Sequence, residues 1–205
     1  KVASTGKPMF ISTGMATISE LGELVQTIKS AECNDFALLK CTSTYPASPE
    51  NSNILSIPHM CKLFQCEVGL SDHTMGIGAA VAAVAHEATI IEKHFTLRRA
   101  DGGVDSAFSM EPEEMKQLVI ETERAWQSLG SVKYGPTEAE KPSMKFRRSL
   151  YIAQDMNAGD VLTKENLRCI RPGMGLPPKY YEMLLGRKVR CDLNKGTASS
   201  WELFV

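Results

Sequence analysis

Residues 67–94 have the pattern of one strand–helix–strand unit. Two apolar runs, 68–70 and 89–91, are separated by an alanine-rich segment at 76–88, and each run leads into a histidine, His73 or His94. Neighbouring parallel strands end at the same edge of a sheet, so we expect both imidazoles to face one point there. Two neutral imidazoles at one point can bind a divalent metal. The alternative is that both are ordinary polar residues at strand ends.

The same alternation of apolar runs and helical segments occurs four times between residues 8 and 129. The runs are apolar throughout, which is typical of parallel strands covered on both faces. Four such units make half of a (β/α)8 TIM barrel, and an open four-stranded α/β sheet has the same pattern. The expected strands are 8–12, 35–41 and the runs ending at 70 and 91, and the expected helices start near 17 and cover 53–64, 76–88 and 111–129.

Local signals support the expected helices. Thr17 and Glu20 have the spacing of a capping box, and Pro112 falls in a first helical turn, where proline is tolerated. Apolar residues at helical spacing predict an apolar stripe on each of three helices. These stripes are Leu21, Leu24, Val25 and Ile28; Ile54, Leu55, Ile57, Met60 and Leu63; and Met115, Leu118, Val119, Thr122, Ala125, Trp126 and Leu129.

The composition changes after residue 130. Residues 131–148 are rich in Lys, Pro, Gly and Glu, which predicts a linker or surface extension. Residues 149–205 contain short apolar runs separated by turns about ten residues apart, with a short helix expected at 178–185. We therefore expect an α/β domain at 1–130, a linker at 131–148 and a small, mostly β domain at 149–205.

Charge and cysteine content exclude several classes of protein. A net charge of −1 gives no basic surplus for nucleic acid or an anionic membrane, and no apolar run is long enough to span a bilayer. The six cysteines contain no CxxC pair, which indicates reduced thiols of a cytoplasmic protein without a signal peptide. A zinc site built on Cys61 and Cys66 is disfavoured because no second ligand pair accompanies them.

Eight motifs, in this order and at these spacings, resemble the carboxyl-terminal part of the nonulosonic (sialic) acid synthases. They are KPMFISTGM (7–15), LLKCTSTYP (38–46), GLSDHT (69–74), IIEKHFT (90–96), DGGVDSAFSMEP (101–112), EKP (140–142), NAGDVLTKENL (157–167) and RPGMGLPP (171–178). The second and fifth motifs are most similar to those of pseudaminic acid synthases. The N-acetylneuraminate and legionaminate synthases are close neighbours.

The resemblance implies an architecture. The family has a (β/α)8 barrel followed by a small domain similar to the type III antifreeze protein, the SAF domain, which caps the active site of the neighbouring subunit in a domain-swapped homodimer. Residues 1–130 would be the second half of that barrel. The acidic residue and the phosphate-binding lysines of the first four units have no counterpart in this sequence. We therefore expect this polypeptide alone to lack part of the active site.

The resemblance also implies a reaction, in which phosphoenolpyruvate condenses with an N-acetylated amino sugar and phosphate is released. The expected acceptor is 2,4-diacetamido-2,4,6-trideoxy-altrose and the expected product is pseudaminic acid. His73 and His94 match the family's metal-binding pair and, with Asp105, are the expected catalytic residues. A divalent metal can polarise the sugar aldehyde. Manganese suits two imidazoles with additional oxygen ligands, and magnesium or cobalt are expected substitutes.

The remaining site residues also follow from the resemblance. Ser43 and Ser71 match positions that contact phosphoenolpyruvate, Asp105 matches a carboxylate that binds acceptor hydroxyls, and Tyr45 lies at the substrate mouth. Arg171 matches a cap-domain arginine that reaches the acceptor's N-acetyl group. Taken on their own, these residues have plainer interpretations as strand-end hydroxyls, a turn aspartate, an aromatic packed on a turn and a surface arginine.

Two other functions are compatible with parts of the sequence. One is a class II-type metal aldolase, which also uses histidine ligands at barrel strand ends. The other is a non-catalytic sugar-binding fragment.

Lys40 is a candidate partner for an anion only if its side chain points to the inner face of the sheet.

Overall fold

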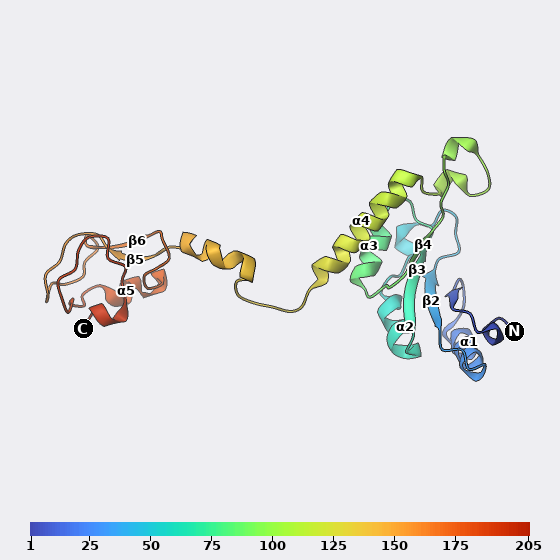
Figure 1. Ribbon diagram of the computed structural model, residues 1–205, viewed down its shortest axis with the longest axis horizontal. Coiled ribbons are helices and arrows are strands. Elements are labelled where there is room, and N and C mark those ends of the chain that lie inside the picture. Colours follow the sequence, from blue (N-terminus) through green and yellow to red (C-terminus); the bar gives the residue numbers. More distant parts are fainter. The chain divides into compact units, whose positions relative to one another are not determined.

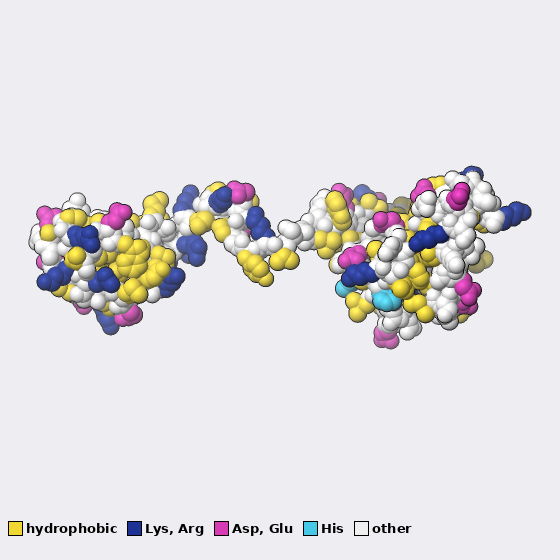
Figure 2. Space-filling view, turned by 90° about the horizontal axis from the view of Figure 1, so that it is seen from below, with side chains coloured by type: hydrophobic (Ala, Val, Ile, Leu, Met, Phe, Trp, Pro, Cys, Tyr) yellow, Lys and Arg dark blue, Asp and Glu magenta, His cyan; other side chains and the backbone are white.

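The computed structural model describes residues 1–205, which form two compact units, Lys1–Ser131 and Val132–Val205. The first unit is built on a parallel sheet and the second on a small antiparallel pair of strands (Figure 1). No helix in either unit is long and apolar enough to cross a membrane. On the face seen in Figure 2, basic and acidic side chains are interspersed over both units.

The first unit repeats a strand and a helix four times. Its elements are β1 (Met9–Ser12), α1 (Ile18–Ser30), β2 (Phe36–Cys41), α2 (Ser56–Phe64), β3 (Glu67–Asp72), α3 (Gly78–Ala85), β4 (Ile91–Lys93) and α4 (Pro112–Leu129). The strands pair in parallel in the order β1-β2-β3-β4. This confirms the predicted α/β class and the parallel half-barrel sheet. A closed barrel has twice as many strands and is not present in this chain.

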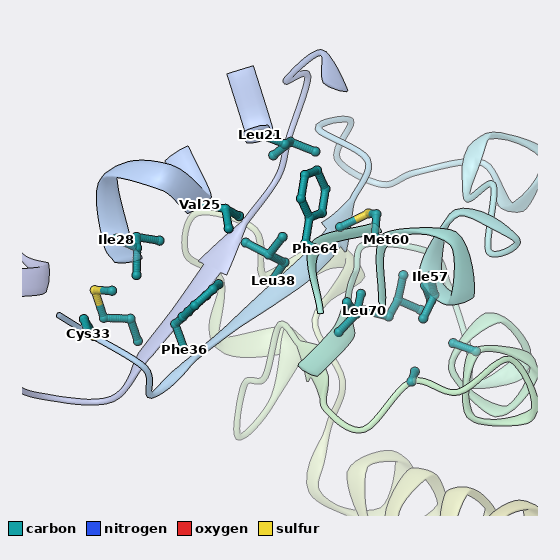
Figure 3. Close-up of a cluster of buried hydrophobic side chains, with 14 residues drawn as sticks. Leu21, Val25, Ile28, Cys33, Phe36, Leu38, Ile57, Met60, Phe64 and Leu70 are labelled. Atoms are coloured by element: carbon teal, nitrogen blue, oxygen red, sulfur yellow. The ribbon is translucent and has the colours of Figure 1, made fainter. Parts of the chain in front are cut away.

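One face of the sheet is covered by helices. Phe36 and Leu38 of β2 and Leu70 of β3 pack against apolar side chains of α1 and α2 in a single core cluster (Figure 3). Side chains alternate along a strand, so Leu39, Gly69 and Ser71 lie on the opposite, inner face. Lys40 shares the face of Leu38, not the inner face. Its Nζ donates to Cys41 O at 2.8 Å, and burial lowers the pKa of Lys40.

Local signals placed the start of α1 correctly. Thr17 is its N-cap, and Glu20 accepts a 2.6 Å hydrogen bond from the Thr17 backbone N–H while Thr17 Oγ1 accepts one from the Glu20 N–H at 3.4 Å. Pro112 lies in the first turn of α4, as predicted. The strand predicted at 89–91 instead spans Ile91–Lys93, which brings its end next to His94.

Two of the predicted apolar stripes are only partly buried. On α2 the buried residues are Ile57, Met60 and Phe64, whereas Leu55 and Leu63 are exposed. The helix begins at Ser56, so Leu55 lies before its first turn. On α4 only Leu118 is buried. Val119, Trp126 and Leu129 have the predicted spacing but are exposed, and they lie outside the buried core clusters of the first unit.

The second unit has few regular elements. β5 (Ser149–Ile152) pairs antiparallel with β6 (Leu167–Ile170), and isolated antiparallel bridges such as Met156–Leu193 and Val189–Phe204 extend the pairing. Leu150, Ile152, Leu162, Leu167 and Leu184 form its core, and α5 (Tyr181–Leu184) covers it. A 3-10 helix, Glu138–Phe146, occupies half of the segment predicted as a linker.

Candidate active site

The carboxyl edge of β3 and β4 brings His73 and His94 together. Their ring centroids are 5.2 Å apart and the rings are nearly perpendicular, at 78°. His73 is buried, and its Nδ1 lies 2.8 Å from the carbonyl oxygen of Thr42. A carbonyl oxygen only accepts hydrogen bonds, so Nδ1 carries the proton and Nε2 keeps a free lone pair. Histidines that bind metals are commonly held in this way.

Asp105 faces the second histidine. Its Oδ2 lies 3.8 Å from His94 Nδ1, and both side chains are partly exposed. A carboxylate on the Nδ1 side favours a proton there, and in the neutral ring this leaves Nε2 of His94 without a hydrogen. Asp105 has a left-handed backbone with φ of 67°, and Gly102 and Gly103 before it also have positive φ. The two glycines adopt these angles without a side-chain penalty.

The loop that carries Asp105 is tied down at its base. Met110 N donates to His94 O at 2.8 Å, so the loop closes directly beside the histidine. Arg99 Nε donates to Ser109 O at 3.0 Å, and the Arg99 guanidinium pairs with Glu114 on α4. The hydrogen bond between Arg99 and Glu114 lowers the pKa of Glu114 and raises the pKa of Arg99.

Aromatic rings flank the two imidazoles. Tyr45 lies 4.3 Å from His73 and 5.8 Å from His94, measured between ring centroids. Phe108, from the Asp105 loop, lies 5.0 Å from His94 and 6.1 Å from Tyr45. Sequence reasoning included Tyr45 but missed Phe108. The only signal for Phe108 was its position in the motif that contains Asp105.

The two predicted serines lie on neighbouring strand ends. Ser71 is buried on the inner face, and its hydroxyl donates to Glu92 Oε1 at 2.7 Å. Ser43 lies beside the β1–α1 turn, where a Cβ added at Gly14 would be 3.3 Å from Ser43 Oγ. The role of Glu92 as the partner of Ser71 was not predicted, although its acidic character beside His94 was evident in the sequence.

Arg171 belongs to the second unit. It is exposed and directly follows β6, whose last residue is Ile170.

The structure groups His73, His94, Asp105 and Tyr45 at one sheet edge, with Ser71 and Ser43 on adjoining strand ends. No group of three or more His, Cys, Asp or Glu side chains is arranged to hold a metal ion.

Known proteins resemble this chain over nearly its whole length. Residues 1–134 match the NeuB family, and residues 147–205 match the SAF domain. The pseudaminic acid synthase of Campylobacter jejuni is 40% identical over 197 residues, covering 96% of this chain and 57% of that protein. The N,N'-diacetyllegionaminic acid synthase of Legionella pneumophila is 38% identical over 205 residues, covering 98% of this chain and 58% of that protein.

A solved structure supports the same assignment. The crystal structure of N-acetylneuraminic acid (sialic acid) synthetase from Leptospira borgpetersenii, in complex with citrate, superposes with a TM-score of 0.64 at 36% identity, over 71% of this chain and 51% of that one. The chain thus spans little more than half the length of these relatives. The family match covers more than half of this chain and includes both histidines and the Asp105 loop. The chain belongs to the NeuB family.

Proposed function

We propose that this chain supplies the metal-binding and sugar-binding half of a nonulosonic acid synthase, which condenses phosphoenolpyruvate with an N-acetylated amino sugar. The observation that carries the proposal is the pair of imidazoles 5.2 Å apart, each with its Nδ1 turned toward a protein oxygen. Membership of the NeuB family and relatives that are named pseudaminic and N,N'-diacetyllegionaminic acid synthases support it.

His73 and His94 fit a divalent metal. Two imidazoles that bind one ion through Nε2 at about 2.1 Å have ring centroids roughly 5 Å apart, close to the observed 5.2 Å. Two nitrogen ligands with further oxygen ligands from water or substrate suit manganese, and magnesium or cobalt as substitutes. When bound, such an ion supplies Lewis-acid polarisation of the sugar's aldehyde oxygen.

In the proposed reaction, C3 of phosphoenolpyruvate attacks the aldehyde carbon of the open-chain sugar, and the aldehyde oxygen takes up a proton. Water then adds at C2, and phosphate leaves by cleavage of its bond to C2, which yields a 2-keto acid. Asp105 is placed to accept hydrogen bonds from acceptor hydroxyls while it orients His94. Tyr45 and Phe108 provide the apolar walls that hold the sugar against the imidazoles.

The serines would bind phosphoenolpyruvate. The Ser71 hydroxyl donates to Glu92 in this structure, so it must rotate to donate to an anionic substrate. Ser43 offers a second hydroxyl on the next strand end. Arg171 would donate to the acetamido carbonyl of the acceptor. Because Arg171 lies in the SAF unit, this role belongs to a domain-swapped homodimer of the complete synthase.

Metal binding is tested directly on this chain. Manganese titrations by calorimetry are expected to show one site that His73→Ala and His94→Ala each abolish. His59→Ala and His86→Ala are matched controls, because both of these histidines are exposed and lie on or next to helices away from the strand ends. Equal binding by wild type and both site variants, all folded, would contradict the proposal.

The reaction is tested by phosphate release from phosphoenolpyruvate. The assay compares this chain alone with a fusion that places the amino-terminal part of the C. jejuni relative in front of it. We expect release from the fusion only when an amino sugar is present. We expect 2,4-diacetamido-2,4,6-trideoxy-altrose to be preferred over the acceptors of N-acetylneuraminate and legionaminate synthases. A fusion that binds manganese but releases no phosphate with any acceptor would refute the synthase and leave the aldolase or a sugar-binding fragment.

A further inference from the structure

A buried ion pair lies directly behind the two histidines. Asp72 and Lys93 are the last residues of β3 and β4, and they are partners in the parallel register of the two strands. Lys93 Nζ lies 2.9 Å from Asp72 Oδ2, and both side chains are only 2% exposed. The residue that directly follows each strand is a histidine of the candidate site, His73 or His94.

Every charged atom of the pair has a hydrogen-bond partner, and Lys93 uses all of its donors. Lys93 Nζ donates to Asp72 Oδ2 and also to the carbonyl oxygens of Thr74 at 2.7 Å and Gly76 at 2.8 Å. Asp72 Oδ1 accepts from Thr74 N at 2.9 Å. An ammonium group has three hydrogens, and all three are used. Lys93 therefore connects β4 both to β3 and to the loop that leads into α3.

A second cross-strand bond lies one residue earlier and on the other face. Ser71 and Glu92 are register partners, joined by their 2.7 Å hydrogen bond on the inner face. Asp72 and Lys93 follow on the helix-covered face, because side chains alternate along strands. The two bonds thus hold β3 and β4 together from both sides, immediately before the histidines.

We propose that Asp72 and Lys93 are positioning residues, which hold His73 and His94 in the relative orientation needed to share one ligand. The significance for catalysis rests on the proposed function, whereas the effect on ring positions does not. The pair is neutral as a whole, so its influence on a bound cation acts mainly through geometry. Residues that orient metal ligands typically affect metal affinity by about 10- to 100-fold.

The test uses the double variant Asp72→Asn/Lys93→Met in this chain. It removes both charges together, because Lys93→Met alone would leave a buried carboxylate without a partner. A second double variant, Asp72→Asn/Lys93→Gln, keeps a neutral hydrogen-bonding group on β4 and serves as the conservative comparison. The control is Glu113→Gln/Lys116→Met, which removes a 3.5 Å ion pair that is exposed on α4.

The first measurement is NMR of the four histidine rings in the metal-free protein. We expect the ring signals of His73 and His94 to shift in Asp72→Asn/Lys93→Met and to return toward wild type in the Gln variant. His59 and His86 are internal reporters of intact folding and should not shift. Ring signals that coincide with wild type at all four histidines would overturn the proposal. If the Met variant does not fold, the Gln variant is measured alone. Its incomplete return to wild type then appears as a small remaining shift of the His73 and His94 signals, and signals that coincide with wild type would overturn the proposal.

The second measurement is the manganese titration. We expect the Met double variant to bind manganese about 10- to 100-fold more weakly than wild type, with no change in the α4 control. If wild type binds no manganese while the His73 and His94 signals shift as predicted, the metal part of the proposed function fails and the positioning role stands. If wild type binds manganese and the folded double variant has equal affinity and unchanged ring signals, the positioning role fails and the proposed function stands.

Discussion

Gly69→Ala should destabilise the first unit through a steric conflict in the middle of the sheet. A Cβ at position 69 would lie 2.4 Å from Ile90 O, 2.8 Å from Ile90 Cβ and 2.7 Å from Leu39 Cδ2. The leucine methyl can rotate away, but Ile90 O cannot, since it accepts the 2.8 Å hydrogen bond from Leu70 N that joins β3 to β4. The added methyl must therefore push the two strands apart.

Overpacking of this kind typically costs 1–3 kcal/mol, and a backbone contact places Gly69→Ala near 3 kcal/mol. With a urea m-value of about 2 kcal/mol/M, the unfolding midpoint falls by roughly 1.5 M. Far-UV circular dichroism reports this unit, because α1 to α4 all belong to it. Gly22→Ala, in the middle of α1 with nothing within 4 Å of its Cβ, is the matched control. It should raise the free energy of unfolding by about 0.5–1 kcal/mol. A Gly69→Ala midpoint equal to that of wild type would show that β3 and β4 can move apart at no cost in stability, and the steric argument would be wrong.

Three further predictions concern packing, capping and charge. Leu38→Ala, at a fully buried position, should lower the free energy of unfolding by about 2–5 kcal/mol in the same urea assay. Thr17→Ala should cost about 1 kcal/mol at neutral pH. Hydrogen bonds from Thr17 lower the pKa of Glu20. The part of the cap that depends on the Glu20 carboxylate is present above its unfolded-state pKa and is lost as the pH falls through its folded-state pKa. The bond from the Glu20 N–H to Thr17 Oγ1 remains, so the urea midpoints of wild type and variant should move closer in acid without becoming equal. Arg99→Ala should raise the pKa of Glu114 toward its ordinary value, measured by carbon-13 NMR titration, and an unchanged pKa would contradict the pairing of Arg99 with Glu114 at the base of the Asp105 loop.

Features that depend on neighbouring residues were predictable from the sequence. The capping box of Thr17 and Glu20 and the proline at the start of α4 are local signals, and the structure has both. The strand–helix repeat gave the parallel order of β1 to β4, because each crossover returns the chain to the same edge of the sheet. The meeting of His73 and His94 follows from that order alone.

Features that depend on distant contacts were not predictable. The start of α2 was predicted too early, because its N-cap, Leu55, makes no side-chain capping bond and no local signal marks the first turn. The α4 stripe was read with the correct period, but exposure of Trp126 depends on what packs against the helix, which sequence spacing does not reveal. Phe108 reaches His94 only through the conformation of a glycine-containing loop, and that conformation has no periodic signature.

The strand ends themselves show how the sequence specifies this site. Ser71-Asp72-His73 on β3 faces Glu92-Lys93-His94 on β4, and each position meets a complementary partner: a hydroxyl meets a carboxylate, a carboxylate meets an ammonium, and an imidazole meets an imidazole. A slip of one residue in one direction would place Asp72 opposite Glu92, two like charges that destabilise a cross-strand pair. A slip in the other direction would separate Lys93 from Asp72 and leave the buried carboxylate without its cation, which is strongly unfavourable. Any slip of one residue also turns inner-face side chains toward the helices. The observed register satisfies all three positions at once, so the residues that align the strands are also those that bring the histidines together.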